Sequence, residues 1–198
     1  MDVVVIVGDI THLGDLGEAQ TALGPVLRSG ARLVAVGGNM DREGARRFLV
    51  DKGIDIHGRG VIVDGVGFMG LGGGTPSPFK TPWELAPDEA SRCLAAGFAQ
   101  IAAAPYKVLV SHAPPHATEI DRSFTRMHVG SVPVREFLLG GARGSGRIDL
   151  CICGHIHEAI GQDSVGGTTC VNVGAFKNGR YALITIIGGH AEITWRTR

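Results

Sequence analysis

The sequence lacks an excess of charge of either sign. Its 198 residues include 19 Lys and Arg and 19 Asp and Glu, so the formal net charge is zero. A nucleic-acid-binding surface needs a basic stripe that displaces counterions from phosphates, and we therefore expect no nucleic-acid partner. No apolar run approaches the roughly 20 residues that cross a bilayer, so we expect no membrane partner either.

The start of the chain lacks a basic segment. Met1 and Asp2 are followed directly by Val3, which is unlike the start of a secretory signal. Cysteine is scarce as well, with four in the chain, and a neutral domain of this size needs no disulfides. We therefore predict a cytoplasmic protein with free thiols. Cys151 and Cys153 would pack on one face of a strand as small hydrophobic residues, because structural zinc sites space their paired ligands more widely.

Linkers and internal repeats are also missing, and the chain is long enough for one well-buried core. We therefore predict a single domain over residues 1–198. Asp15 and Glu18 have the spacing of a capping box and predict a helix that is bent or shortened at Pro25. Asp41 is the predicted N-cap of a second helix. Further predicted elements are a hairpin at 61–69, helices at 87–103 and 131–139, a surface loop at 140–146 and a β-meander over 160–196.

Residues 70–76 superficially resemble a dinucleotide-binding loop because they are rich in glycine. The third glycine of that pattern is missing at the required offset, and prolines follow where a helix should begin. We expect instead a long irregular loop through Pro82, of the kind that often borders a functional site.

The most informative pattern is an apolar run that ends in Gly or Ser and is followed at once by a metal-ligand side chain. Short β-branched runs of this kind are typical of buried parallel strands. Ligands of open α/β sheets bind outside the carboxyl ends of such strands. The pattern occurs four times, at 3–7 before Asp9, at 33–36 before Asn39, at 108–110 before His112, and at 150–153 before His155 and His157.

These side chains combine a carboxylate, an amide oxygen and imidazole nitrogens. Mixed nitrogen and oxygen donors suit Mn, Fe, Zn or Ni better than Mg or Ca, which take nearly all oxygen. Taken singly, Asp9, Asn39 and His112 are more typical of a turn, a helix cap or a solvated loop. The repetition at four equivalent strand ends, together with the closely spaced His155 and His157, is what predicts a metal centre.

The order of these motifs resembles the calcineurin-like metallophosphoesterases, and most closely their Icc-like prokaryotic branch of predicted phosphoesterases. The resemblance covers almost the whole chain with no large insertion, and it extends to residues 75–85, 128–131 and 171–174. It implies an α/β/β/α four-layer sandwich with a dinuclear metal centre between its loops. The motifs that carry it are Gly8-Asp9-Ile10-Thr11-His12, Gly38-Asn39-Met40-Asp41, Ser111-His112-Ala113-Pro114-Pro115 and Gly154-His155-Ile156-His157.

The resemblance also implies roles for individual residues. Asp9 would bridge a pair of divalent cations, Asn39, His112 and His155 would complete one site, and His157 would bind the other metal. A metal-bridging hydroxide would attack the phosphorus of a small phosphomonoester or phosphodiester. Asp9, Asn39 and His112 are on this basis also the candidate catalytic residues.

Two positions depart from the family pattern. Family members begin with another strand ending in Asp-x-His, whereas this chain begins at what would be the second strand, so we expect an N-terminally incomplete domain whose first strand and helix are missing. The family histidine after Gly-Asn is Met40 here, and a thioether has no proton to donate. Three loop histidines are candidates for the substrate pocket and for that proton donor, namely His12, His116 and His128. His57 and His190 are expected at the surface.

The sequence thus predicts a metal-dependent hydrolase of phosphate esters. The alternative is a catalytically depleted protein of the same fold that binds a metal or a nucleotide as a scaffold or sensor. A purely structural metal site and a homo-oligomeric state also remain open at this point.

Overall fold

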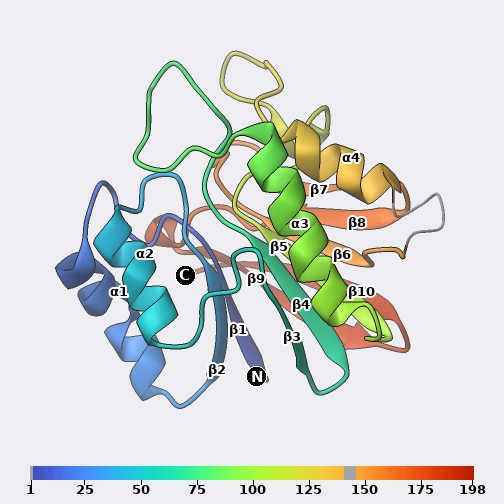
Figure 1. Ribbon diagram of the computed structural model, residues 1–198, viewed down its shortest axis with the longest axis horizontal. Helices are drawn as coiled ribbons and strands as arrows, with labels where there is room; N and C mark the ends of the chain where they lie inside the picture. Colours follow the sequence, from blue (N-terminus) through green and yellow to red (C-terminus); the bar gives the residue numbers. More distant parts are fainter. Residues whose placement is uncertain (1, 141–145) are drawn as a thin grey trace.

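The computed structural model describes residues 2–140 and 146–198, so most of the predicted loop at 140–146 lies outside the described residues. The strands form two packed layers with helices on both outer sides (Figure 1). α1 (Leu16–Arg28) and α2 (Glu43–Asp51) cover one side. α3 (Pro87–Ile101) and α4 (Val132–Gly140) cover the other. This arrangement confirms the predicted α/β/β/α architecture.

The larger layer is a six-stranded sheet in the order β3-β4-β5-β6-β8-β7. Its four central strands are parallel, and the two outer strands run antiparallel to their neighbours. The predicted hairpin at 61–69 is confirmed as the antiparallel pair of β3 and β4. The strand bounds are β3 Gly60–Val63, β4 Val66–Leu71, β5 Tyr106–Ser111, β6 Leu150–Cys153, β7 Gly161–Val165 and β8 Thr168–Asn172.

The smaller layer holds two strand pairs. β1 (Val3–Val7) runs parallel to β2 (Arg32–Val36), and within the described residues it pairs with no other strand. β9 (Arg180–Ile187) and β10 (His190–Thr197) form an antiparallel hairpin. The predicted meander over 160–196 is therefore wrong in its second half, because β6 and β7 already occupy both edges of β8. β9 and β10 instead lay their apolar face on the larger sheet.

Local sequence explains where α1 begins but not where α2 begins. Asp15 and Glu18 form the predicted capping box of α1, which continues through Pro25 to Arg28. The prediction for Asp41 is wrong, because α2 begins after Arg42, which makes no side-chain cap. Asp41 is fully buried and accepts hydrogen bonds from the backbone N–H groups of Ile10 and Thr11. These contacts tie together the loops that follow β1 and β2.

The cysteines are free, as predicted, and three of them pack in the core between the larger sheet and its helices. Cys151 and Cys153 are fully buried in this core, so their thiols contribute to packing. Among the residues that the structure describes, no helix is both long enough and apolar enough to span a membrane.

Candidate metal centre

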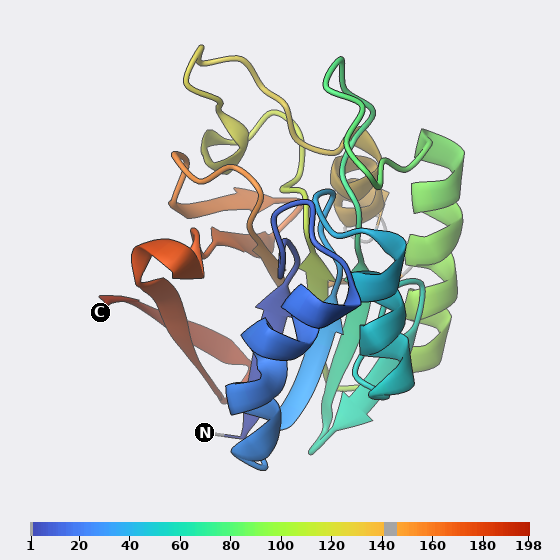
Figure 2. The ribbon, with the colours of Figure 1, turned by 90° about the vertical axis from the view of Figure 1, so that its left-hand side faces the viewer.

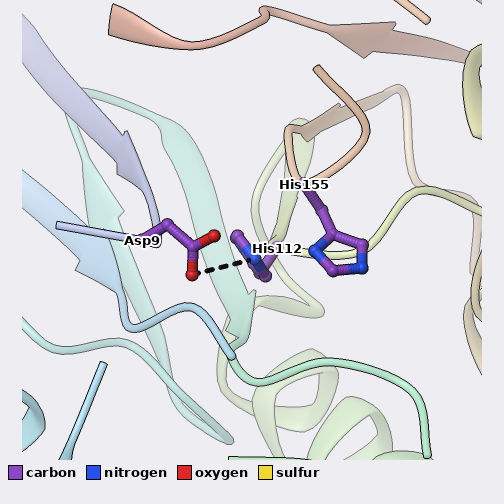
Figure 3. A group of neighbouring side chains, drawn as sticks. All are labelled: Asp9, His112 and His155. Atoms are coloured by element: carbon purple, nitrogen blue, oxygen red, sulfur yellow. Dashed lines mark ion pairs between the residues drawn. The ribbon is translucent and has the colours of Figure 1, made fainter. Parts of the chain in front are cut away.

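The carboxyl ends of β1, β5 and β6 bring three potential metal ligands together. One ligand atom each of Asp9, His112 and His155 lies within 4.8 Å of the others (Figure 3). The imidazole centroids of His112 and His155 are 4.9 Å apart. Residues more than a hundred positions apart thus meet at one point because their strands end at the same edge of the two sheets.

Asn39 adds a fourth donor from the end of β2. Its side-chain Oδ1 lies 3.0 Å from Nε2 of His112, and the residue is 6 % exposed. The same Nε2 lies 3.3 Å from Oδ1 of Asp9. Strands from both layers therefore supply the donors, which cluster around a single ring nitrogen.

The hydrogen bonding of His112 tests whether a cation fits this cluster. Its Nδ1 lies 2.6 Å from the carbonyl oxygen of Val7, which can only accept, so Nδ1 carries the proton. In the neutral ring Nε2 then presents a lone pair toward the oxygens of Asp9 and Asn39. Three electron-pair donors that face one another need a shared proton or a cation between them, and the donor set fits a divalent transition metal.

Electrostatics favour ligation at Asp9 and His112. Burial of His112 would lower its pKa, but the hydrogen bond and the negative charge of Asp9, together with the Val7 carbonyl, raise it above its usual value. Burial of Asp9 would raise its pKa, yet contacts with His112 and the N–H of Met40 hold that pKa below its ordinary value. Without a metal, Asp9 therefore stabilises a proton on His112. A cation bound between the two residues would take the place of that proton and carry charge of the same sign.

His155 has the opposite behaviour. Burial, followed by the charge of His112, lowers its pKa to about 4. The ring is therefore neutral near pH 7, which is the form of imidazole that binds metals.

The backbone is bent sharply to aim these donors. Asp9 and His155 have φ angles of 50° and 65°, a region that L-residues seldom occupy. A Cβ on Gly38 would lie 2.1 Å from Oδ1 of Asp9, and a Cβ on Gly8 would lie 2.5 Å from Nδ1 of His112. The glycines that precede Asp9 and Asn39 are therefore required by the close approach of the two loops.

Residues 1–187 match the family described as the calcineurin-like phosphoesterase superfamily domain. The chain belongs to this superfamily. It is 32 % identical over 176 residues to the "Uncharacterized protein MJ1162" of Methanocaldococcus jannaschii, covering 86 % of this chain and 76 % of that protein.

Solved structures share the fold of this calcineurin-like phosphoesterase. The crystal structure of TT1561 of Thermus thermophilus has a TM-score of 0.71 at 17 % identity, with 98 % of this chain and 85 % of that chain covered. A dimetal phosphatase from Danio rerio has a TM-score of 0.65 at 13 % identity, with 100 % and 81 % covered. At these identities the likeness shows the fold alone.

Two further predicted site residues, His157 and His12, lie outside the group of Asp9, His112 and His155. His157 is half-buried, and burial followed by the charge of Lys177 lowers its pKa, with Asp9 acting in the opposite direction. It therefore lies within electrostatic reach of Asp9, although it is outside the group of three ligands. His12 is exposed on the loop after β1. The roles of these residues as ligands or pocket residues stay predictions.

His116 and His128 do not join the cluster but contact a residue that the sequence analysis missed. Both lie beside Asp121, which is fully buried. A signal for it exists in the sequence, because Thr118 and Asp121 have the spacing of a capping box, and the structure shows that box at the 3₁₀ helix η1 (Glu119–Asp121).

The prediction that His57 lies at the surface is wrong in part, because the residue is half-buried. Its Nδ1 accepts a hydrogen bond of 3.0 Å from the N–H of Gly72, and its ring packs edge-on against Trp83. Burial, followed by the positive charge of Arg46, lowers the pKa of His57 to about 4. This histidine supports the start of the glycine-rich loop, whereas His190 is exposed as predicted.

Proposed function

We propose that the protein is a metal-dependent phosphoesterase that hydrolyses a small phosphomonoester or phosphodiester. The observation that carries the proposal is Nε2 of His112, which faces the oxygens of Asp9 and Asn39 at 3.3 and 3.0 Å. The family match supports this class of activity, and the likeness to a structure described as a dimetal phosphatase agrees with it.

Asp9, Asn39, His112 and His155 would hold one divalent cation, for which we propose manganese as the first choice. We propose that His157 and Asp9 contribute to a second. A divalent cation bound here would act as a Lewis acid and stabilise the charge that develops on the phosphoryl oxygens. The chain itself fixes the donors: the Val7 carbonyl orients His112, and the N–H of Met40 orients Asp9 at 2.9 Å.

We further propose that the substrate is a small soluble molecule in the cytoplasm. The zero net charge of the chain disfavours a polyanionic nucleic acid. The free cysteines agree with a reducing compartment.

Calorimetry and turnover together test the proposal. Metal-free protein would be titrated with Mn²⁺, and hydrolysis of p-nitrophenyl phosphate and bis(p-nitrophenyl) phosphate would be followed with and without the ion. We expect saturable Mn²⁺ binding and turnover that needs the ion. Binding without turnover of either ester would overturn the enzymatic assignment, and no binding of Mn²⁺ or of Zn²⁺, Fe²⁺ or Ni²⁺ would overturn the metal centre.

Met40 favours the second candidate, a scaffold or sensor that binds a metal or a nucleotide without hydrolysis. Its backbone holds Asp9, but its thioether cannot protonate a leaving group. This candidate predicts metal or nucleotide binding with no chemical change of any phosphate ester. The turnover measurement above therefore separates the two candidates.

A further inference from the structure

A second cluster of titratable groups stands apart from the metal centre. Nδ1 of His128 lies 2.5 Å from Oδ1 of Asp121, and Nδ1 of His116 lies 3.6 Å from the other carboxylate oxygen. The two imidazole centroids are 5.8 Å apart. Asp121 is 0 % exposed, whereas the side chains of His116 and His128 are 36 % and 30 % exposed. One buried carboxylate thus stands behind two rings that reach solvent.

The carboxylate is held in place by the backbone. The N–H groups of Ala117, Thr118 and Gly130 donate to it at 3.1, 3.0 and 3.0 Å. Burial would raise the pKa of Asp121, but the hydrogen bonds from His128, Gly130 and Thr118 hold that pKa below its ordinary value. An ionised carboxylate only accepts hydrogen bonds, so Nδ1 of His128 is the donor in the short contact. Its other nitrogen, Nε2, is therefore left facing away from Asp121.

The cluster stands over the same strand ends as the metal centre. Its loop begins directly after His112, and on one side Oγ1 of Thr75 reaches the carbonyl of Val129 at 3.5 Å. On the other side the N–H of Phe124 donates to Glu158, the neighbour of His157, at 2.8 Å. Figure 2 shows this loop (yellow) and the glycine-rich loop (green) rising together above the strands.

Of the two imidazoles beside Asp121, His128 is the one held by the shorter contact, at 2.5 Å against 3.6 Å for His116. Met40 has no proton to give. Two charged neighbours of His128 are occupied with each other: Arg122, which forms a β-bridge with His128, is paired with the exposed Glu119 at 2.9 Å. Imidazole is the commonest general acid in enzymes, and a carboxylate behind it fixes the tautomer and the orientation of the ring.

We propose that His128 is the general acid that protonates the leaving group and that Asp121 is its positioning residue, an assignment that rests on the proposed phosphoesterase function. As the bond between phosphorus and the leaving oxygen breaks, its electron pair stays on that oxygen. The oxygen takes the Nε2 proton of the His128 imidazolium. The ring becomes neutral while Nδ1 still donates to Asp121, and water returns the proton to Nε2.

Leaving-group dependence tests the assignment. A leaving group that is already stable as an anion needs no proton, whereas a poor one depends on it. We expect His128→Gln to slow Mn²⁺-dependent hydrolysis of phenyl phosphate about 100-fold while changing that of 2,4-dinitrophenyl phosphate far less. Asp121→Asn should move the ratio of the two rates in the same direction. His190→Gln, which changes an exposed histidine on β10, is the matched control and should leave the ratio unchanged.

A readout without metal checks the positioning role. In ¹⁵N NMR spectra of the metal-free protein, the ring signal that is absent from His128→Gln identifies His128. We expect this ring to be protonated at Nδ1 in the wild type, with a proton resonance that moves upfield in Asp121→Asn. The second substitution His128→Asn guards against a folding defect of the first.

The outcomes separate the general-acid role of His128 from the phosphoesterase function of the protein. If the wild type hydrolyses both esters and His128→Gln slows them equally or not at all, the general-acid role is overturned and the phosphoesterase function stands. If the wild type hydrolyses neither ester, the proposed function is overturned and the assignment of His128 falls with it. A bare Nδ1 in the NMR spectra would overturn the positioning role of Asp121.

Discussion

Two histidine–aspartate pairs of this protein are built in opposite ways. In the pair of His112 and Asp9, the imidazole is 1 % exposed and the carboxylate is the more exposed partner, at 19 %. In the pair of His128 and Asp121, the carboxylate is buried and the imidazole is 30 % exposed. The same two residue types therefore differ in which partner can meet a ligand.

The difference lies in where the backbone supplies hydrogen bonds. At the metal centre the Val7 carbonyl fixes the ring of His112, so its Nε2 points inward at the side-chain oxygen of Asn39. In the loop cluster three N–H groups fix the carboxylate of Asp121, so the ring of His128 points outward. An inward lone pair suits a cation, and an outward N–H suits a proton transfer.

The largest expected effect breaks the first pair. Asp9→Asn removes the negative charge that faces His112 while keeping the shape of the side chain. We expect the dissociation constant for Mn²⁺ to rise at least 100-fold, since loss of an outer partner of a metal ligand alone costs roughly 10- to 100-fold. Calorimetric titration measures it, and Asp64→Asn, at an exposed ion pair with Arg32, is the matched control. Unchanged affinity in Asp9→Asn would remove Asp9 from the metal centre.

The next effect comes from His57, a half-buried histidine whose pKa is lowered by burial and by the charge of Arg46. Its folded pKa of about 4 lies below the unfolded value of 6.5, so below pH 6.5 the unfolded chain binds more protons. Stability is therefore lost as the pH falls from 6.5 to 4, by up to about 3 kcal/mol from this residue.

Urea unfolding at several pH values measures the contribution of His57. His57→Asn keeps an acceptor for the N–H of Gly72 but cannot titrate, so its free energy of unfolding should depend less on pH in this window. An equal pH dependence in both proteins would show that His57 is already accessible to protons when folded.

A smaller effect sharpens the contrast between the two carboxylates. Asp121→Asn replaces an acceptor by an NH₂ group that faces backbone N–H donors, and we expect a loss of about 2 kcal/mol in the free energy of unfolding. Mn²⁺ affinity should stay close to that of the wild type, because Asp121 lies outside the group of Asp9, His112 and His155. A large loss of affinity would show that the two clusters are coupled.

The smallest effect concerns the contact between the loops after β1 and β2. Thr11→Val removes the hydrogen bond of 2.8 Å from Oγ1 to Asp41 and should cost about 1 kcal/mol in urea unfolding. Thr21→Val is the control, because its Oγ1 bonds to Gly17 on the exposed face of α1. Equal losses in the two variants would mean that Asp41 does not depend on Thr11.

Much of this molecule is predictable because its signals are local. The apolar runs before Asp9, Asn39, His112 and His155 specify strands, and parallel strands end at one edge. The capping box at Asp15 is complete within four residues. These features need no knowledge of distant neighbours.

The predictions that failed concern features that depend on residues far away in the sequence. Asp41 caps no helix because backbone groups 30 and 31 positions earlier take its oxygens. His57 is half-buried and contacts Trp83 and Cys93, which come from another part of the chain. The place of β9 and β10 depends on β8 being already paired on both edges.

The left-handed backbone of Asp9 and His155 carries a consequence for engineering. Glycine adopts this conformation without strain, whereas an L-residue loses on the order of 1 kcal/mol there. A search for heat-resistant variants that scores only folding would therefore favour glycine at both positions and discard the donors. Thermal selection of this protein needs a metal-affinity screen alongside it.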